Sequence, residues 1–367
     1  MPSPLRAEVV GSMLRPPHLV RARGEHRAGT LVTTDFKRIE DRAVDGAIAL
    51  QEGVGLRVVT DGEMRRGIFT GPLTENVGGL EYVPGVTRIW YTDKGPVEEE
   101  LPLVVTGKLT FGASAVTEEF SYARARARAR LKVSLPSPLM MFLRWSPRHS
   151  TAAYSDAFAM AADAAAIVRD EIRRLAALGC DYIQIDAPEI ATLVQRETRD
   201  WYERQGISTK RILTDGLELL NSVTDTPGVT FAVHLCRGNR NGRWMAVGGY
   251  DYVAEALFHR CTGFHRFLLE YDDERSGTFE PLAAAPPDKI VVLGLVSTKT
   301  ATVEPVEDVV ARIRRAAEHL PLDQLAVSTQ CGFASMVEAH PELSEDVQSA
   351  KLALVTAATA EVWDTSH

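Results

Sequence analysis

The stretch that decides the fold is Val229-Thr230-Phe231-Ala232-Val233-His234-Leu235-Cys236, an apolar run that ends in two metal-ligating side chains. Short apolar runs of this kind are typical of strands buried on both faces of a parallel sheet. His234 and Cys236 are two positions apart, so both side chains lie on the same face of an extended strand. We therefore expect a buried strand whose carboxyl end carries two ligands.

Similar apolar runs recur along the chain, with amphipathic stretches between most of them. The predicted strands are Ala7–Val10, Leu56–Thr60, Leu131–Leu135, Tyr182–Ile185, Val229–Val233, Phe267–Leu269, Ile290–Val296 and Leu325–Val327. The predicted helices are Asp35–Gln51, Ser155–Leu178, Arg211–Val223, Tyr252–Arg260, Val306–His319 and Glu345–Glu361. This alternation predicts an α/β fold, a closed (β/α)8 TIM barrel. A doubly wound open sheet is the alternative, but no glycine-rich phosphate-binding turn follows the first strand.

Residues 80–111 interrupt the alternation of strands and helices. Apolar and polar residues alternate there, and turn residues occur at Pro84-Gly85 and Lys94-Gly95. This pattern predicts a β-hairpin that leaves the barrel after its second strand. We expect residues 1–367 to form one catalytic barrel domain with residues 80–111 inserted.

Composition limits the class of protein. The chain has 367 residues, 45% of them hydrophobic, and a net charge of −8, which argues against a nucleic-acid surface. No apolar run reaches the length of a membrane span, and the first residues lack the layout of a signal peptide. Four cysteines in a chain of this length indicate a reducing compartment. We predict a cytoplasmic enzyme with small-molecule partners, in which Cys180 and Cys261 are packing residues.

An Ala-Arg alternation runs through Arg124, Arg126, Arg128 and Arg130 and resembles a nucleic-acid-binding arm. The acidic net charge favours another interpretation. We interpret these arginines as the solvated part of an alanine-rich helix that leads into Leu131.

Polar or ligating residues occur at or just after the carboxyl end of every predicted strand. They are Ser12, Glu63, Pro136, Asp186, His234, Cys236, Glu270, Ser297 and Cys331. Barrel enzymes build their sites at this rim from many strands, so these residues are expected to converge. A His/Cys/Cys set with an acidic fourth member suits a zinc ion that handles thiols.

The order of several motifs makes a family recognisable. The motifs are Val10-Gly11-Ser12 with Arg15-Pro16, Thr60-Asp61-Gly62-Glu63, Ile183-Gln184-Ile185-Asp186 with Pro188, His234-Leu235-Cys236 and Gln330-Cys331-Gly332-Phe333. The chain resembles the cobalamin-independent methionine synthases, and more closely their short single-barrel members. The resemblance runs nearly from end to end of this chain but covers only the catalytic, C-terminal half of the full-length synthase.

The resemblance implies a ligand set and a substrate site. Zinc would be held by His234, Cys236, Glu270 and Cys331, although Asp272, Asp273 and Glu274 compete with Glu270 for the acidic position. Ser12 would hold the acceptor's carboxylate, while Glu63 and Asp186 would hold its amino group. A salt bridge to Arg65 or Arg66 is the alternative for Glu63, and Arg15 could bind a sulfonate or phosphate.

Three departures from the family pattern concern the alkyl donor. The half of the long synthase that helps to hold a polyglutamylated folate is absent. The family's Asp-Glu-Pro is Asp186-Ala187-Pro188 here, and the Tyr-Asp-Ile-His-Ser segment is Val296-Ser297-Thr298-Lys299-Thr300. Lys299 therefore takes the place of a proton-donating histidine. It could donate a proton if its pKa were lowered, or it could pair with a carboxylate or with an anionic substrate.

Two thiolates and a carboxylate around Zn²⁺ give the site a formal charge of −1, which suits thiolate activation better than hydrolysis. The leading hypothesis is methyl or alkyl transfer to a zinc-bound thiolate, with homocysteine as the default acceptor. The donor would be 5-methyltetrahydrofolate, a methyl-corrinoid or a small metabolite. The alternative is a coenzyme M-type thiol transferase or lyase, with Arg15, Arg237 or Lys299 facing the sulfonate. A metal-free decarboxylase and a zinc- or redox-storage protein are further hypotheses.

Overall fold

A curled parallel β-sheet forms the centre of the computed structural model, which describes residues 5–92, 94–337 and 340–364. Seven strands pair in the order β1-β13-β12-β11-β10-β9-β8, and β2 pairs with β7. The strands are β1 (Ala7–Glu8), β2 (Val58–Val59), β7 (Arg130–Leu131), β8 (Val133–Pro136), β9 (Tyr182–Asp186), β10 (Thr230–Leu235), β11 (Arg266–Glu270), β12 (Ile290–Val296) and β13 (Leu325–Thr329). The predicted α/β class and parallel sheet are confirmed.

The first and last strands of the sheet lie side by side, because β1 pairs in parallel with β13. Only Lys132 separates β7 from β8, so the separate β2–β7 pair continues along the chain into the edge strand β8. The loops that follow β1 and β2 are also bonded to each other. The Thr60 hydroxyl donates to the Gly11 carbonyl over 2.7 Å, and the Met13 amide donates to the Gly62 carbonyl over 3.0 Å.

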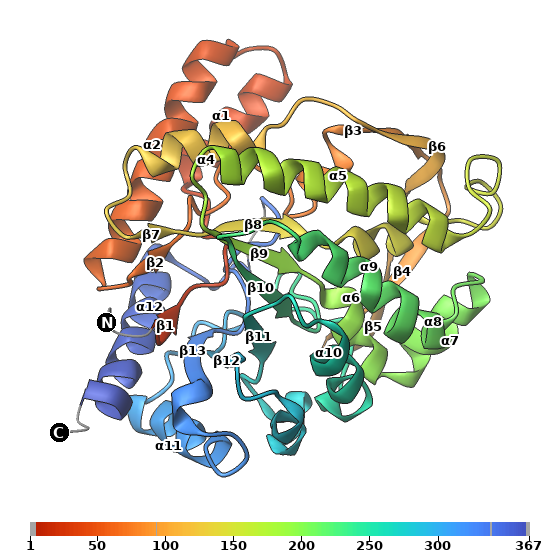
Figure 1. Ribbon diagram of the computed structural model, residues 1–367. Coiled ribbons are helices and arrows are strands. Elements are labelled where there is room, and N and C mark those ends of the chain that lie inside the picture. Colours follow the sequence, from red (N-terminus) through yellow and green to blue (C-terminus); the bar gives the residue numbers. More distant parts are fainter. Residues whose placement is uncertain (1–4, 93, 338–339, 365–367) are drawn as a thin grey trace.

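The concave face of the sheet encloses a small apolar cluster of its own. It contains one residue on or next to each of seven strands: Val10, Val58, Tyr182, Ala232, Leu268, Val292 and Ala326. Because side chains alternate along a strand, their neighbours such as Val233, Phe267 and Val291 point outward into the main core. Figure 1 shows the helices arranged around the outside of the strands.

The helices are amphipathic and cover the outer face of the sheet. They are α1 (Pro17–Arg27), α2 (Thr33–Gly53), α3 (Gly71–Thr74), α4 (Val116–Arg124), α5 (Ala157–Ala177), α6 (Pro188–Ala191), α7 (Arg196–Arg204), α8 (Thr209–Arg211), α9 (Leu217–Asn221), α10 (Ala254–Arg260), α11 (Val306–Ala316) and α12 (Glu345–Thr359). In α5 the Asp156 side chain caps the first turn by accepting from the Ala159 amide. None of the helices in the described ranges is long and apolar enough to cross a bilayer.

Between β2 and β7 the chain leaves the sheet as two nested antiparallel pairs. β3 (Val77–Tyr82) pairs with β6 (Leu103–Phe111), and β4 (Thr87–Thr92) pairs with β5 (Gly95–Glu100). The Tyr91 and Trp244 backbones exchange hydrogen bonds of 2.7 and 3.1 Å. We call residues 77–111 the insertion; its tip is thereby fixed to the loop that follows β10.

The interpretation of the Ala-Arg stretch as a helix leading into Leu131 is wrong, because α4 ends at Arg124. The Glu52 carboxylate accepts hydrogen bonds from the Arg128 and Ala129 amides, so these donors are unavailable to a helix. Arg128 also pairs with Glu52 at 2.9 Å, and Arg130 pairs with Asp181 at 3.0 Å.

A buried ionic cluster occupies the amino end of the sheet. The Glu8 carboxylate accepts from Tyr182 Oη over 2.6 Å, from Arg266 Nε over 2.6 Å and from Lys132 Nζ over 3.2 Å. Burial raises the pKa of Glu8, but Arg266 and Lys132 outweigh it and hold that pKa below its usual value. We call these four residues the Glu8 cluster.

Candidate metal centre and active site

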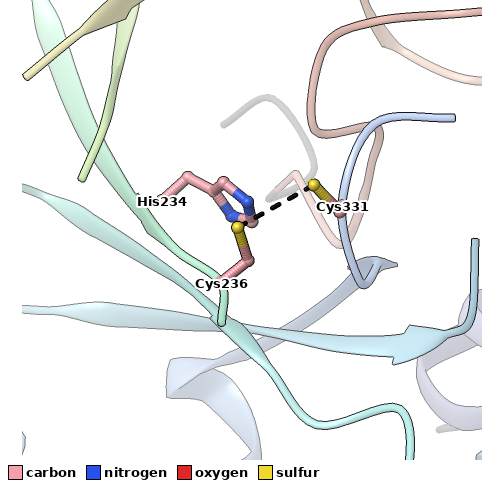
Figure 2. Close-up of side chains that lie close together, drawn as sticks. All are labelled: His234, Cys236 and Cys331. Atoms are coloured by element: carbon pink, nitrogen blue, oxygen red, sulfur yellow. Dashed lines mark hydrogen bonds between the residues drawn. The ribbon is translucent and has the colours of Figure 1, made fainter. Parts of the chain in front are cut away.

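His234, Cys236 and Cys331 converge at the carboxyl end of the sheet. Their ligand atoms lie within 4.8 Å of one another, and the two sulfurs are 3.9 Å apart. Figure 2 shows the three side chains pointing toward a common point, two from the end of β10 and one from the loop after β13. All three are buried. The convergence of these three predicted ligands is a property of the fold, since β10 and β13 are not neighbours in the sheet.

The position of Cys331 depends on a close approach between the first and last strands. A Cβ on Gly332 would lie 2.0 Å from Ser12 Oγ, so no larger residue fits there without moving Ser12. The Phe333 amide donates to the Ser12 carbonyl over 2.8 Å. The predicted acceptor-binding serine and the third ligand, Cys331, therefore lie in one bonded unit.

The unbonded state of the imidazole indicates that this cluster fits a cation. Within the described part of the chain, neither ring nitrogen of the buried His234 has a hydrogen-bond partner of normal geometry, and the Cys236 sulfur is a close neighbour that does not complete one. This is costly for a polar group removed from water. The hydrogen bond shared with Cys331, together with burial, raises the pKa of Cys236 well above that of a free thiol. A bound divalent cation would satisfy the imidazole and reverse this effect on the Cys236 sulfur. The donor set is consistent with zinc.

Glu270 lies beside this cluster, with its carboxylate bonded to protein groups. Oε2 accepts from the Arg237 amide over 2.6 Å, and Oε1 accepts from Lys299 Nζ over 2.8 Å. Burial raises the pKa of Glu270, but Lys299 and Arg237 hold it below its usual value. Burial lowers the pKa of His234, but nearby negative groups outweigh burial and raise this pKa above its usual value. The Cys236 sulfur contributes most to the increase, and the Glu270 carboxylate contributes less.

Lys299 is held between two carboxylates, Glu270 at 2.8 Å and Asp272 at 3.1 Å. Burial lowers the pKa of Lys299, but the two acids outweigh it and raise the pKa above its usual value. Of the two alternatives for this lysine, pairing with a carboxylate is the one that the geometry shows.

A cavity of about 380 Å³ opens directly over the three ligands. It contains six of the predicted site residues: Ser12, Glu63, Asp186, His234, Cys236 and Cys331. The insertion forms part of the opposite wall through Tyr82, Arg88 and Trp90. Substrate-sized space therefore lies between the ligand cluster and the insertion.

The two predicted amine-binding carboxylates are both buried on this cavity. Glu63 has a left-handed backbone, φ 55°, which is rare for a residue with a side chain. Its Oε1 accepts from Ser134 Oγ over 2.6 Å and lies 3.7 Å from Arg66, while Oε2 has no partner. Burial raises the pKa of Asp186 to about 6, and Gln184 donates to this carboxylate over 2.7 Å.

Arg15 and Arg237 support the loops rather than line the cavity. The Arg15 guanidinium donates to main-chain carbonyls, including those of Glu63 at 2.9 Å and Ala334. Arg237 donates to the carbonyls of Gly248, Glu270 and Ser276 at 2.8 to 3.2 Å. Both side chains are buried, so their charges are used in holding rim segments together.

Sequence reasoning missed several ionisable residues on the cavity wall, among them Arg144 and Glu189. Arg144 ends a short 3-10 helix, Pro138–Arg144, and makes no hydrogen bond or ion pair within the described part of the chain. Glu189 follows the Asp186-Ala187-Pro188 strand end directly, a place that could have drawn attention to it. Cys180 and Cys261 lie in the core, away from the cavity.

The comparisons with known proteins agree with this site. Residues 5–352 match the family model described as "Cobalamin-independent synthase, Catalytic domain". The chain belongs to the cobalamin-independent methionine synthase catalytic domain family. The resemblance inferred from the motifs is thereby confirmed.

Relatives in this family include proteins of unassigned role. The chain is 33% identical to "Uncharacterized protein YxjH" of Bacillus subtilis over 98% of this chain and 95% of that one. It is 24% identical to a methionine synthase of Saccharolobus solfataricus, over 90% of this chain and 88% of that one.

Among solved structures, a putative vitamin-B12 independent methionine synthase from Listeria monocytogenes aligns with a TM-score of 0.74 and 26% identity, covering 98% of both chains. A B12-independent methionine synthase from Shewanella, in complex with selenomethionine, has the same fold. Its TM-score is 0.75 at 20% identity, and 99% of this chain and 98% of that chain are covered.

Proposed function

We propose that this protein is a zinc-dependent enzyme that transfers a methyl or alkyl group to a substrate thiolate, with homocysteine as the default acceptor. The observation that carries the proposal is the convergence of His234, Cys236 and Cys331 on one buried point beneath a substrate-sized cavity. Bound Zn²⁺ would lower the pKa of an incoming thiol and keep its sulfur nucleophilic. We also propose that the curled sheet is a closed (β/α)8 barrel and that the protein is cytoplasmic.

The roles of the protein side chains follow from their positions. His234, Cys236 and Cys331 would hold the metal. Glu270 is proposed as the fourth ligand from the family resemblance; it would have to exchange its bond to the Arg237 amide or to Lys299 for the metal. Ser12 and the adjacent backbone would bind the acceptor's carboxylate. Glu63 and Asp186, buried on the same cavity, would bind its ammonium group, since two carboxylates favour a cation over an anion. The alkyl donor, a methylfolate or methyl-corrinoid by family, would enter between this site and the insertion.

The test compares Cys331→Ala with a matched control, Cys261→Ala, which removes a buried core thiol outside the cavity. We expect the purified protein and the control to hold about one zinc per chain by elemental analysis. Zinc X-ray absorption should gain a sulfur neighbour when homocysteine is added. Cys331→Ala should lose both zinc and transfer activity. A Cys331→Ala protein without zinc that keeps full transfer activity would refute the proposal.

A second candidate function is a coenzyme M-type thiol transferase or lyase, and Arg144 is the observation that favours it. This arginine lines the cavity and has no acidic partner in the described part of the chain, so it is available to a sulfonate. Arg144→Met should raise the KM for coenzyme M about tenfold or more, since a charge-assisted hydrogen bond contributes about 1.5–3 kcal/mol. Arg124→Met, on the surface at the end of α4, is the control. An unchanged KM would exclude this candidate.

A further inference from the structure

Glu189 is a buried acid on the cavity wall with no assigned role. It lies at the start of α6, directly after β9, and only 2% of its surface is exposed. Neither carboxyl oxygen has a hydrogen-bond partner among the residues that the structure describes, and the nearby Ser137 hydroxyl does not complete a bond of normal geometry. An ionised carboxylate left in this state would be strongly disfavoured. Glu189 is therefore suited to carry a proton.

The charged surroundings of Glu189 agree with this assignment. Burial raises the pKa of Glu189 to about 8, the Ser137 hydroxyl lowers it in part, and Asp186 raises it further. The Tyr202 phenol is close enough to feel the Glu189 charge, and Arg88 stacks on the neighbouring Trp201 ring at 4.0 Å. From the segments packed against α6, His234 and Arg144 also face the cavity. None of these groups forms an ion pair with Glu189.

Alkyl transfer creates a demand for a proton on the donor side. When a sulfur attacks carbon, the electron pair of the breaking bond goes to the leaving atom, and a basic nitrogen or oxygen then needs protonation. Gln184 donates to the Asp186 carboxylate over 2.7 Å, Ser134 donates to Glu63 over 2.6 Å, and Lys299 is held by Glu270 and Asp272. Among the buried acids that the structure describes on this cavity, Glu189 is the one whose two carboxyl oxygens both lack a partner.

We propose that Glu189 donates the proton to the leaving group of the alkyl donor; the inference rests on the proposed thiol alkylation. In this step the S–C bond forms, the bond from carbon to the leaving atom breaks, and that atom takes the Glu189 proton. The carboxylate regains a proton from the next acceptor thiol as it ionises. The net reaction converts a thiol and the donor into a thioether and the protonated leaving group. The donor class implied is one with a basic nitrogen or oxygen leaving atom.

The first test measures protonation without turnover. The infrared spectrum of the zinc-loaded parent minus that of zinc-loaded Glu189→Gln isolates the Glu189 carboxyl group. At pH 7 this difference should contain the carbonyl band of a protonated carboxyl, and the band should disappear as the pH rises through about 8. Glu171→Gln is the matched control, because Glu171 is also buried with a raised pKa but lies outside the cavity. It should leave the Glu189 band in place. Absence of the band at pH 7 would overturn the proposal.

The second test separates this role from thiol activation by using two donors with homocysteine. Iodide leaves methyl iodide without a proton, whereas the amine of 5-methyltetrahydrofolate needs one. Glu189→Gln should alkylate with methyl iodide within about twofold of the parent and should lose about 10²–10⁴-fold with the folate donor. Equal folate rates in Glu189→Gln and Glu171→Gln would overturn the proposal for Glu189. Failure of zinc-loaded parent protein to outpace zinc-free protein with methyl iodide would instead refute the proposed function.

Discussion

The two ends of the sheet both bury charged groups, yet they treat them in opposite ways. In the Glu8 cluster at the amino end, both carboxylate oxygens, the lysine, the arginine and the tyrosine have partners. At the carboxyl end, His234, Glu63 and Glu189 keep buried atoms for which the described residues offer no hydrogen-bond partner. Satisfied networks stabilise a fold, whereas unsatisfied groups persist where a ligand completes them. The comparison assigns stability to one end and chemistry to the other.

The largest expected effect follows from breaking the satisfied end. Glu8→Gln leaves the cationic Lys132 and Arg266 buried without a counter-ion, so the free energy of unfolding should fall by about 3–5 kcal/mol. Urea denaturation at pH 7 measures it. The control is Asp181→Asn, which removes an exposed partner of Arg130 and should cost about 1 kcal/mol or less. A Glu8→Gln loss no larger than the control would contradict the comparison.

The Glu8 cluster also predicts how the free energy of unfolding changes as the pH is lowered. Because the folded pKa of Glu8 lies below the unfolded value, its contribution is fully present above about pH 4.3 and is lost as pH falls through the folded pKa. Unfolding free energies between pH 7 and pH 3 should therefore fall less steeply for Glu8→Gln than for the parent. Parallel curves would show that Glu8 does not control this change.

At the carboxyl end of the sheet, we expect a substitution of intermediate effect that increases the free energy of unfolding. The folded pKa of Glu189 lies above its unfolded value, so its contribution to stability is lost as pH rises from about 4.3 to about 8. Across this pH range the free energy of unfolding of Glu189→Gln should therefore increase relative to that of the parent, by about 1–3 kcal/mol at pH 8. Urea denaturation at pH 5 and pH 8 measures the difference. A constant offset between the two proteins would indicate that Glu189 titrates normally.

The smallest effect is expected away from both ends, in the Ala-Arg stretch. Arg128 is mostly exposed, and Glu52 keeps its bonds to the Arg128 and Ala129 amides when the guanidinium is removed. Arg128→Ala should change the unfolding free energy by about 0.5 kcal/mol or less. Glu52→Ala removes the carboxylate that accepts from both amides, so it should lower the unfolding free energy by more, about 1–2 kcal/mol. The reverse ranking would mean that the exposed ion pair matters more than the backbone bonds.

Much of the fold could be predicted from the sequence because apolar runs record burial on both faces. The run Ile290–Val296 agrees with β12 at both ends, and Ser155–Leu178 exceeds α5 by two residues at its start and one at its end. The Ala-Arg stretch was misread because helix propensity is local, whereas the Glu52 carboxylate that captures its amides comes from a distant helix.

The candidate site divides in the same way. His234, Cys236 and Cys331 could be predicted because sulfur and imidazole at strand ends are rare and carry their chemistry with them. The pairing of Lys299 with Asp272 and the burial of Glu189 depend on which loops pack against which. A glutamate and an arginine are ordinary surface residues in a sequence, so Glu189 and Arg144 became visible only once their surroundings were known.

The separation of the ligands along the chain has a consequence for biosynthesis. Cys331 follows Cys236 by 95 residues and reaches it only through the last strand, which itself pairs with the first. During synthesis, His234 and Cys236 therefore leave the ribosome well before the third ligand, Cys331. Under the proposed zinc binding, the full ligand set would be complete only once the last strand has been made. Zinc would then bind a largely synthesised chain, unlike the metal of a zinc finger, which drives folding.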